Sequence, residues 1–292
     1  MRFDHRDMTT ARPAAPDPGV IDADVARALA EDVGSGDATA ALIGADVYAT
    51  AAVVTREDAV LAGRPWFDRC FAAVDARTVI EWHADDGDEV AAGQTLCSLR
   101  GFARALLTAE RCALNFLQLL SGTATATAQH VAVVRGTRTT ILDTRKTIPG
   151  LRRAQKYAVR CGGGANHRRG LYDAILIKEN HIAAAGSLAE AVATARALHP
   201  ELTVEVEVED FAELDAALAA GVDRIMLDDF ALADLPAAVA RCAGRVPLEV
   251  SGGVGLQTLQ AIAQTGVDYV SIGALTKHVR AIDLSMRIDL RA

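Results

Sequence analysis

The chain has 292 residues and is 51% hydrophobic but only 4% aromatic, so aliphatic side chains and alanine must fill its core. This length predicts one large or two modest domains. The net charge of −8 argues against a general nucleic-acid-binding protein, whose surface would be basic. No unbroken apolar stretch is long enough to cross a bilayer, so no membrane partner is expected.

The five cysteines are scattered through the chain and have no metal-ligand spacing. We therefore expect reduced, buried thiols and a cytoplasmic protein; the residues are Cys70, Cys97, Cys112, Cys161 and Cys242.

Residues 1–20 combine charged side chains with three prolines and contain no apolar signal-peptide region, so we expect a disordered tail. Residues 21–130 read as an N-terminal α+β domain with a long connecting helix. The long helical stretch covers 103–130, either as one helix or as two that break near Ser121-Gly122. The other elements expected here are a helix over 21–31 and strands over 47–55, 59–63, 77–82 and 95–99.

From residue 131 to 292 the sequence pattern changes, and short apolar β runs alternate with helical segments. Such repetition is typical of a parallel sheet, and close spacing with short loops favours an α/β barrel. Six strands are clear and a seventh is an open alternative, so the barrel is expected to be incomplete. The last strand or helix either stays in the barrel or packs back on the N-terminal domain. The strands expected are 139–143, 174–178, 203–208, 224–228, 247–251 and 268–272; the helices are 188–198, 211–219, 232–242 and 256–264.

Nearly every one of these strands ends at a charged residue or a glycine. In a parallel barrel, the carboxyl ends of the strands meet at one mouth, where binding and catalytic groups gather. Six such ends in succession indicate a site for an anionic ligand together with a metal ion or a developing cation. They are Asp143-Thr144-Arg145-Lys146, Lys178-Glu179-Asn180-His181, Glu207, Asp228-Asp229, Ser251-Gly252-Gly253 and Ile272-Gly273-Ala274.

A basic block lies inside this acidic protein, with Asp173 as its one acid. It points to a multiply anionic small molecule. A solvated helix face is the alternative, and it accounts well for Arg153 and Arg160 but poorly for Arg145 and Lys178, which abut apolar strands. The cations are Arg145, Lys146, Arg152, Arg153, Lys156, Arg160, Arg168, Arg169 and Lys178.

Glycine loops follow the last two strands, at Ser251-Gly252-Gly253 and at Gly273-Ala274. The first opens a helix, so its N–H groups and the helix dipole favour phosphate. Tight turns between strand and helix are the alternative.

Glu207 and Asp228 end consecutive strands and should face the same mouth. They are candidates for holding a divalent cation with its pyrophosphate, or for shielding a developing positive charge. A solvated acidic edge strand is the alternative for Glu205 and Glu209. Asp229 is an alternative cap for the next helix.

These segments resemble the quinolinate phosphoribosyltransferase family, the carboxylating nicotinate-nucleotide pyrophosphorylases, from about Ile21 to the C-terminus. The block over residues 143–181 is the most specific part. Asp229 and Thr123 depart from the family pattern, which commonly has asparagine and isoleucine there. The matching segments are Leu29–Asp32, Gly36–Thr39, Thr108–Gln118, Asp143–Arg152, Lys156–Val159, Gly162–Arg168 and Leu176–His181.

The resemblance implies an α+β sandwich domain followed by an incomplete barrel. It also implies transfer of a phosphoribosyl group from phosphoribosyl pyrophosphate to quinolinate with decarboxylation, with Mg²⁺ as cofactor. The products are nicotinate mononucleotide, pyrophosphate and CO2, in de novo NAD biosynthesis. The family dimer further implies that Arg111 reaches the neighbouring subunit's site, with a hexamer of dimers as a larger assembly.

The family's functional residues carry over position by position. Catalytic roles fall to Lys146, Lys178, Glu207 and Asp228, with Glu207 and Asp228 toward the metal. The expected substrate-binding residues are Arg111, Thr144, Arg145, Lys146, His167, Arg168, Lys178, Glu207, Asp228, Ser251, Gly252, Gly253, Gly273 and Ala274.

Two other readings stay open. Molybdenum-operon homologues share this fold and much of the phosphate site but act on different substrates. A non-catalytic barrel that binds a phosphorylated ligand is the second reading. The cationic set of Arg111, Arg145, Arg168 and Lys178 favours a dicarboxylate substrate over both.

Overall fold

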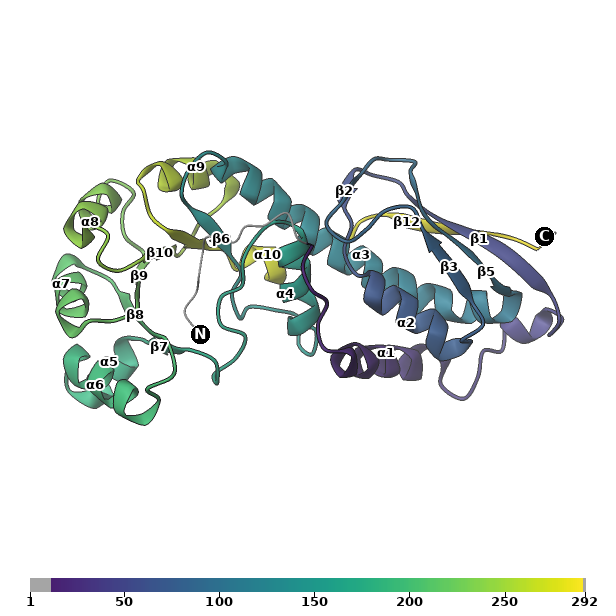
Figure 1. The fold of residues 1–292 in the computed structure, drawn as a ribbon, viewed down its shortest axis with the longest axis horizontal. Helices are drawn as coiled ribbons and strands as arrows, with labels where there is room; N and C mark the ends of the chain where they lie inside the picture. The colour runs from purple at the N-terminus through teal and green to yellow at the C-terminus, as the bar shows by residue number, and fades with distance from the viewer. Residues whose placement is uncertain (1–11, 291–292) are drawn as a thin grey trace. The chain divides into compact units, whose positions relative to one another are not determined.

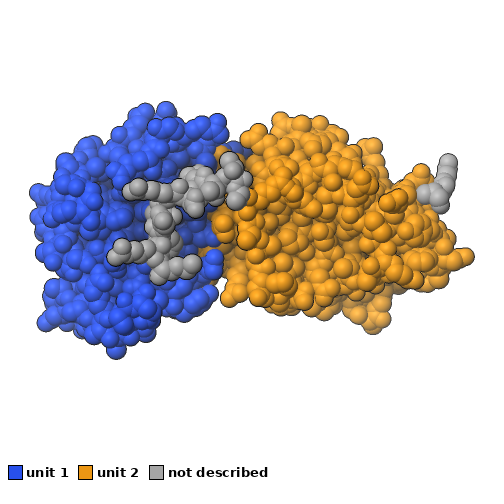
Figure 2. Space-filling view, in the orientation of Figure 1, with its two compact units in different colours: residues 1–9, 129–146, 164–274 blue, residues 10–128, 147–163, 275–292 orange. Residues whose placement is uncertain are grey.

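The computed structural model describes residues 12–290. They form two compact units, which Figure 2 colours separately. Among the described residues, unit 1 comprises Gln129–Lys146 and Gly164–Ala274, while unit 2 comprises the rest of the chain. Most of the expected tail lies outside the described residues, and the first helix begins at Pro18, because Asp17 caps it through the Gly19 N–H.

Unit 2 contains a four-stranded antiparallel sheet in the order β12-β1-β5-β3. Its first strand alternates buried and less buried residues, as expected for a sheet with one face in the core. Strand β12 comes from the end of the chain and pairs with β1 (Figure 1). The strands are β1 (Tyr48–Thr55), β3 (Val79–Trp82), β5 (Thr95–Phe102) and β12 (Leu284–Asp289), with a separate short pair β2 (Ala59–Val60) and β4 (Glu89–Val90).

Helix α3 is the longest element and runs unbroken from Ala103 to Val134. Of the two expectations for this stretch, the single helix is confirmed. Gly122 serves close packing rather than a break, because a Cβ there would collide with the Arg280 carbonyl oxygen. The α-helices α2 and α4 of this unit were not predicted, and α4 lies inside the basic block. The remaining helices of this unit are α1 (Pro18–Val33), η1 (Ala40–Leu42), α2 (Arg64–Val74) and α4 (Arg152–Cys161).

Unit 1 is built on a six-stranded parallel sheet in the order β6-β11-β10-β9-β8-β7. The sheet has edge strands at β6 and β7 and does not close, which confirms the incomplete α/β barrel. Its strands are β6 (Thr140–Leu142), β7 (Ile175–Ile177), β8 (Val204–Val208), β9 (Arg224–Asp228), β10 (Leu248–Ser251) and β11 (Tyr269–Ser271). Helices alternate with them (Figure 1): α5 (Glu179–Ala185), α6 (Leu188–Leu198), α7 (Phe211–Ala220), α8 (Leu235–Cys242), α9 (Leu256–Gln264) and α10 (Ala274–Lys277).

The cysteines are all buried and reduced, as expected from their scattered positions. Among the described residues, no helix has the length and apolar character needed to span a membrane.

Candidate active site

Most of the residues that the sequence predicted for the site lie at or near the carboxyl ends of the six parallel strands, and Arg111 is the exception. Because these strands share one direction, their ends lie at one edge of the sheet, where α/β barrels place their ligands. The register places Ser251 of β10 directly beside Asp228 of β9. Thr144 to Lys146 follow β6, Arg168 precedes β7, Lys178 follows it, Glu207 lies in β8, and Gly273-Ala274 follow β11.

Opposite charges meet at the ends of β7 and β8, where Lys178 and Glu207 form an ion pair. Burial raises the pKa of Asp228, and the nearby carboxylates of Glu207 and Asp229 raise it further. The ammonium groups of Lys178 and Lys146 oppose that shift. The four residues expected to be catalytic are therefore electrostatic neighbours.

The glycine loops leave room for an approaching ligand. Gly252 and Gly253 have φ values of +95° and +56°, a left-handed backbone that favours glycine. A Cβ at Gly273 would lie 2.9 Å from Lys146 Cδ and 3.5 Å from Thr144 Oγ1, so a larger residue would displace these side chains. Helix α9 begins just after the first loop, and its amino end favours an anion.

Asp229 lies beside the first glycine loop, and it adopts the left-handed conformation with φ 52°. Asparagine and aspartate are the residues that tolerate this conformation best, which explains how Asp229 stands where the family commonly has asparagine. The expectation that Asp229 caps the next helix is wrong, because α8 starts at Leu235 with Asp234 at its N-cap.

Two guanidinium groups lie close together at the same edge. Burial lowers the pKa of Arg168, and the neighbouring Arg145 cation lowers it further. Like charges held this close repel each other, and an anion between them would remove the repulsion. Arg153 and Arg160, by contrast, are exposed on α4, as the solvated-face reading expected.

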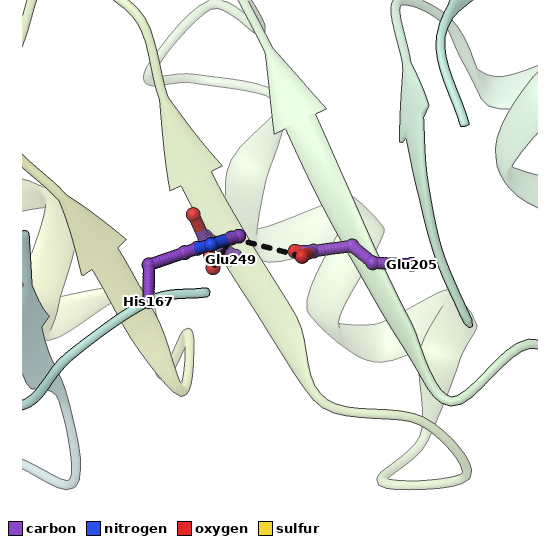
Figure 3. Close-up of side chains that lie close together, drawn as sticks. All are labelled: His167, Glu205 and Glu249. Carbon is purple, nitrogen blue, oxygen red and sulfur yellow. Dashed lines mark ion pairs between the residues drawn. The ribbon is translucent and has the colours of Figure 1, made fainter. Parts of the chain in front are cut away.

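Below these groups, a buried charged cluster comprises His167, Glu205 and Glu249 (Figure 3). Glu205 is only 3% exposed and belongs to β8, which is not an edge strand, so the solvated-strand alternative is wrong for this residue. Glu249 is 0% exposed, and burial followed by the adjacent Glu205 raises its pKa to about 7. The sequence analysis did not single out Glu249 or its ion-pair partner Arg224. The sequence signal available for both residues was a charged side chain in a short apolar strand, at a position that faces the interior.

The cluster could in principle ligate a metal, since one atom from each side chain lies within 4.8 Å of the others. The Arg224 guanidinium argues against this, because its Nη1 atom lies 3.1 Å from Glu249 Oε2 and supplies positive charge there. Glu207 and Asp228 fit a hard divalent cation better, since their carboxylates repel each other at the open edge.

Arg111 and Cys161 do not belong to the strand-end group. Arg111 is exposed on α3 and belongs to unit 2. Cys161 is buried, and burial raises the pKa of its thiol to about 12, so it stays protonated and packs rather than reacts.

Comparisons with known proteins agree with this geometry. The N-terminal and C-terminal domains of quinolinate phosphoribosyl transferase match residues 37–121 and 123–287. The chain is 45% identical over 271 residues to the nicotinate-nucleotide pyrophosphorylase (carboxylating) of Mycobacterium leprae, covering 90% of this chain and 95% of that protein. It is 41% identical over 288 residues to the quinolinate phosphoribosyltransferase (decarboxylating) 1b of Nicotiana tabacum, covering 90% and 80%.

Among solved structures, the nicotinate-nucleotide pyrophosphorylase of Francisella tularensis superposes with a TM-score of 0.91 at 46% identity, over 96% of this chain and 100% of that one. Fold, site and comparisons together define an enzyme of the phosphoribosyltransferase class. The chain belongs to the quinolinate phosphoribosyltransferase family, and its role is in NAD biosynthesis.

Proposed function

We propose that this enzyme joins quinolinate to the ribosyl carbon of phosphoribosyl pyrophosphate and releases pyrophosphate and CO2, giving nicotinate mononucleotide. The observation that carries this proposal is the meeting of three kinds of group at one sheet edge. Closely spaced cations suit a dicarboxylate, paired carboxylates suit a developing cation, and glycine loops suit phosphate.

Quinolinate carries two adjacent carboxylates, which require several cationic partners. Arg145, Arg168 and Lys178 supply them from the strand ends of unit 1. The family pattern adds the Arg111 cation to this set and includes His167 among the quinolinate-binding residues. Removal of one cation should leave a carboxylate only partly neutralised, and binding should weaken accordingly.

Bond exchange at the ribose needs no covalent enzyme intermediate. The ring nitrogen of quinolinate forms a bond to the anomeric carbon as the bond from that carbon to pyrophosphate breaks. Positive charge builds on the ribose in this transition state, and Glu207 and Asp228 are placed to stabilise it. The glycine loops at Gly252-Gly253 and Gly273 hold the ribose 5-phosphate, which fixes the sugar for attack.

Decarboxylation follows on the pyridinium ring. The bond to the 2-carboxylate breaks, CO2 leaves, and the electron pair on the ring carbon takes a proton from solvent. The ring's positive nitrogen stabilises that electron pair, and the ammonium groups of Lys146 and Lys178 add to the stabilisation.

Magnesium is the proposed cofactor. Bound with pyrophosphate, it would neutralise the charge of the leaving group. Glu207 and Asp228 offer the oxygen ligands that this ion prefers. The raised pKa of Asp228 supports this, because a cation nearby would relieve the carboxylate repulsion that contributes to the shift.

The active form is proposed to be a homodimer in which Arg111 enters the partner's site, with a hexamer of dimers as a larger assembly. The exposure of Arg111 on α3 supports a role at an interface. The reduced cysteines support a cytoplasmic location.

A turnover assay tests the proposal. With quinolinate, phosphoribosyl pyrophosphate and Mg²⁺, we expect nicotinate mononucleotide and CO2 in equal amounts, and we expect nicotinate to be a poor substrate because it lacks the second carboxylate. Turnover of a different acceptor but not quinolinate would favour the molybdenum-operon type of homologue. Phospholigand binding without any turnover would favour the non-catalytic barrel.

A further inference from the structure

A charged layer fills the interior of unit 1 directly below the proposed substrate site. Glu205 and Arg224 lie opposite each other in the register of β8 and β9, and Glu249 comes from β10. The exposures are 3% for Glu205, 8% for Arg224 and 0% for Glu249. Burying charges costs several kcal/mol per ion even when they are paired, so apolar side chains would fill this layer at least as well. The charges therefore point to a role other than packing.

The two carboxylates of this layer converge on one ring, that of His167 (Figure 3). Its Nε2 atom lies 2.9 Å from Glu205 Oε2 and 3.6 Å from Glu249 Oε2. Arg224 holds Glu249 from the other side through a 3.1 Å hydrogen bond, and its guanidinium lies over the Tyr269 ring at 4.3 Å. The two distances to Nε2 are ion-pair distances, and the two carboxylates place negative charge beside the Nε2 atom, which favours a proton on that atom.

The other ring nitrogen faces the main chain. The Arg168 backbone N–H donates to Nδ1 of His167 at 2.7 Å, so Nδ1 accepts and carries no proton. The same loop is anchored below, where Asp143 accepts from the His167 N–H at 2.9 Å and from Asn166 Nδ2 at 2.7 Å. A neutral ring whose Nδ1 accepts must carry its proton on Nε2, on the side of the two carboxylates. The contact at Nδ1 also fixes the backbone of Arg168, whose side chain is a proposed quinolinate ligand.

We propose that Glu205, Glu249 and Arg224 are positioning residues that hold His167 in its neutral Nε2–H form, so that His167 acts on quinolinate through Arg168 and not as a direct ligand. This inference rests on the proposed function for the identity of the substrate. It assigns the buried layer a task that apolar side chains could not perform, because carboxylates beside Nε2 favour the tautomer in which Nε2 carries the proton and Nδ1 accepts from the Arg168 N–H.

The tautomer can be measured without substrate. In ¹⁵N spectra of histidine rings, His167 is assigned by the signal that disappears in His167→Asn, and we expect its proton on Nε2. Glu205→Gln removes the carboxylate nearest Nε2 and should shift the His167 ring signals. It should weaken quinolinate binding about tenfold, the loss of roughly one hydrogen bond, with an unchanged KM for phosphoribosyl pyrophosphate. Glu249→Gln should act in the same direction but less, and melting temperature reports whether each variant folds.

Exposed Glu201 provides the matched control, since it lies just before β8. Glu201→Gln should leave both the ring signals and the quinolinate affinity at wild-type values. A folded Glu205→Gln or Glu249→Gln protein with unaltered ring signals and unaltered quinolinate affinity would overturn the positioning role.

Two amides at position 167 separate an indirect role from a direct one. Asparagine places its side-chain oxygen near the position of Nδ1, whereas glutamine places its amide near Nε2. We expect His167→Asn to retain more quinolinate affinity than His167→Gln, because the acceptor for the Arg168 N–H is kept. The reverse order would identify His167 as a direct ligand.

Failure of the proposed function has a different signature. Wild-type protein would then neither bind nor turn over quinolinate, while the tautomer measurement on the free protein would still give its own answer.

Discussion

Lys178 and Glu207 form an ion pair across the carboxyl ends of the neighbouring strands β7 and β8. The cation proposed for quinolinate and the carboxylate proposed for the ribosyl cation thus neutralise each other in the free enzyme. Quinolinate can take over Lys178 as it binds, and this exchange leaves Glu207 charged beside the ribose, where its charge is needed in the transition state.

Neutralising either carboxylate should therefore affect turnover more than affinity. Glu207→Gln and Asp228→Asn keep the shape of the side chain and remove its charge. We expect turnover to fall by about 10²–10³-fold, since the charge acts mainly in the transition state. Quinolinate affinity should change far less, and in Glu207→Gln it should hold or rise because Lys178 is released.

Rate and melting temperature are measured together on both variants. Fully active, stable proteins would show that these carboxylates have no catalytic role. Variants that lose stability while the folded fraction keeps normal activity would show a structural role instead.

Removing a proposed quinolinate cation should weaken binding directly. Lys178→Ala and Arg145→Ala each remove one charge-assisted contact, which contributes about 1.5–3 kcal/mol. Isothermal titration calorimetry with quinolinate measures the loss. Arg160→Ala is the matched control, because Arg160 is an exposed cation of the same basic block and should not affect affinity. Unchanged affinity in both test variants would refute the assignment.

The proposed dimer, in which the subunits share each site, is tested by mixing two inactive variants. Arg111→Ala and Lys178→Ala should each be inactive as pure dimers. After subunit exchange, a mixed dimer has one site with both residues intact, so random mixing should restore about a quarter of wild-type activity. Exchanged dimers that remain inactive would place Arg111 in its own subunit's site or outside the site altogether.

Asp68 in unit 2 makes stability depend on pH. Burial raises its pKa to about 6, although the Trp82 indole donates to it at 2.8 Å. The folded state then binds this proton more tightly than the unfolded state, whose carboxyl titrates near 3.8. The free energy of unfolding therefore falls as pH rises from about 4 to about 6 and is level for this group above that range.

Asp68→Asn keeps the acceptor for Trp82 and removes the titration. The variant should melt higher than wild type at pH 8 and at nearly the same temperature at pH 4. Asp75→Asn is the opposite control, because a hydrogen bond from Arg77 lowers the pKa of Asp75. An equal rise in melting temperature for Asp68→Asn at pH 8 and pH 4 would show that burial does not raise the pKa of the Asp68 carboxyl.

Residues that end strands were predictable from sequence, whereas residues inside the barrel were not. Lys178, Glu207 and Asp228 each follow or end a short apolar run, and parallel strands bring such ends together. Arg224 and Glu249 belong to the consecutive strands β9 and β10 and do not lie at their carboxyl ends, so the strand-end pattern did not reveal their ion pair. Gly122 is a similar case, because the sequence alone does not show whether this glycine breaks the helix or allows another segment to pack closely. The Arg280 backbone, which packs against Gly122, shows that it allows close packing.

The spacing of strands and helices along the sequence predicted the fold of unit 1. The sequence predicted the fold of unit 2 less completely. The short loops between strands and helices in the second half predict a parallel sheet by themselves. Strand β12 pairs with β1 across most of the chain, and local sequence carries no information about that pairing. The bounds of helix α4 were not predicted, because its cations were assigned to the basic block, with a solvated helix face as the alternative. Most of its residues are buried.

A crystal structure with quinolinate bound tests the central claim most directly. The account predicts both carboxylates at the strand ends of unit 1, within about 3 Å of nitrogen atoms of Arg145, Arg168 and Lys178. It also predicts His167 Nε2 still paired with Glu205. Quinolinate bound away from these three cations would contradict the proposed site.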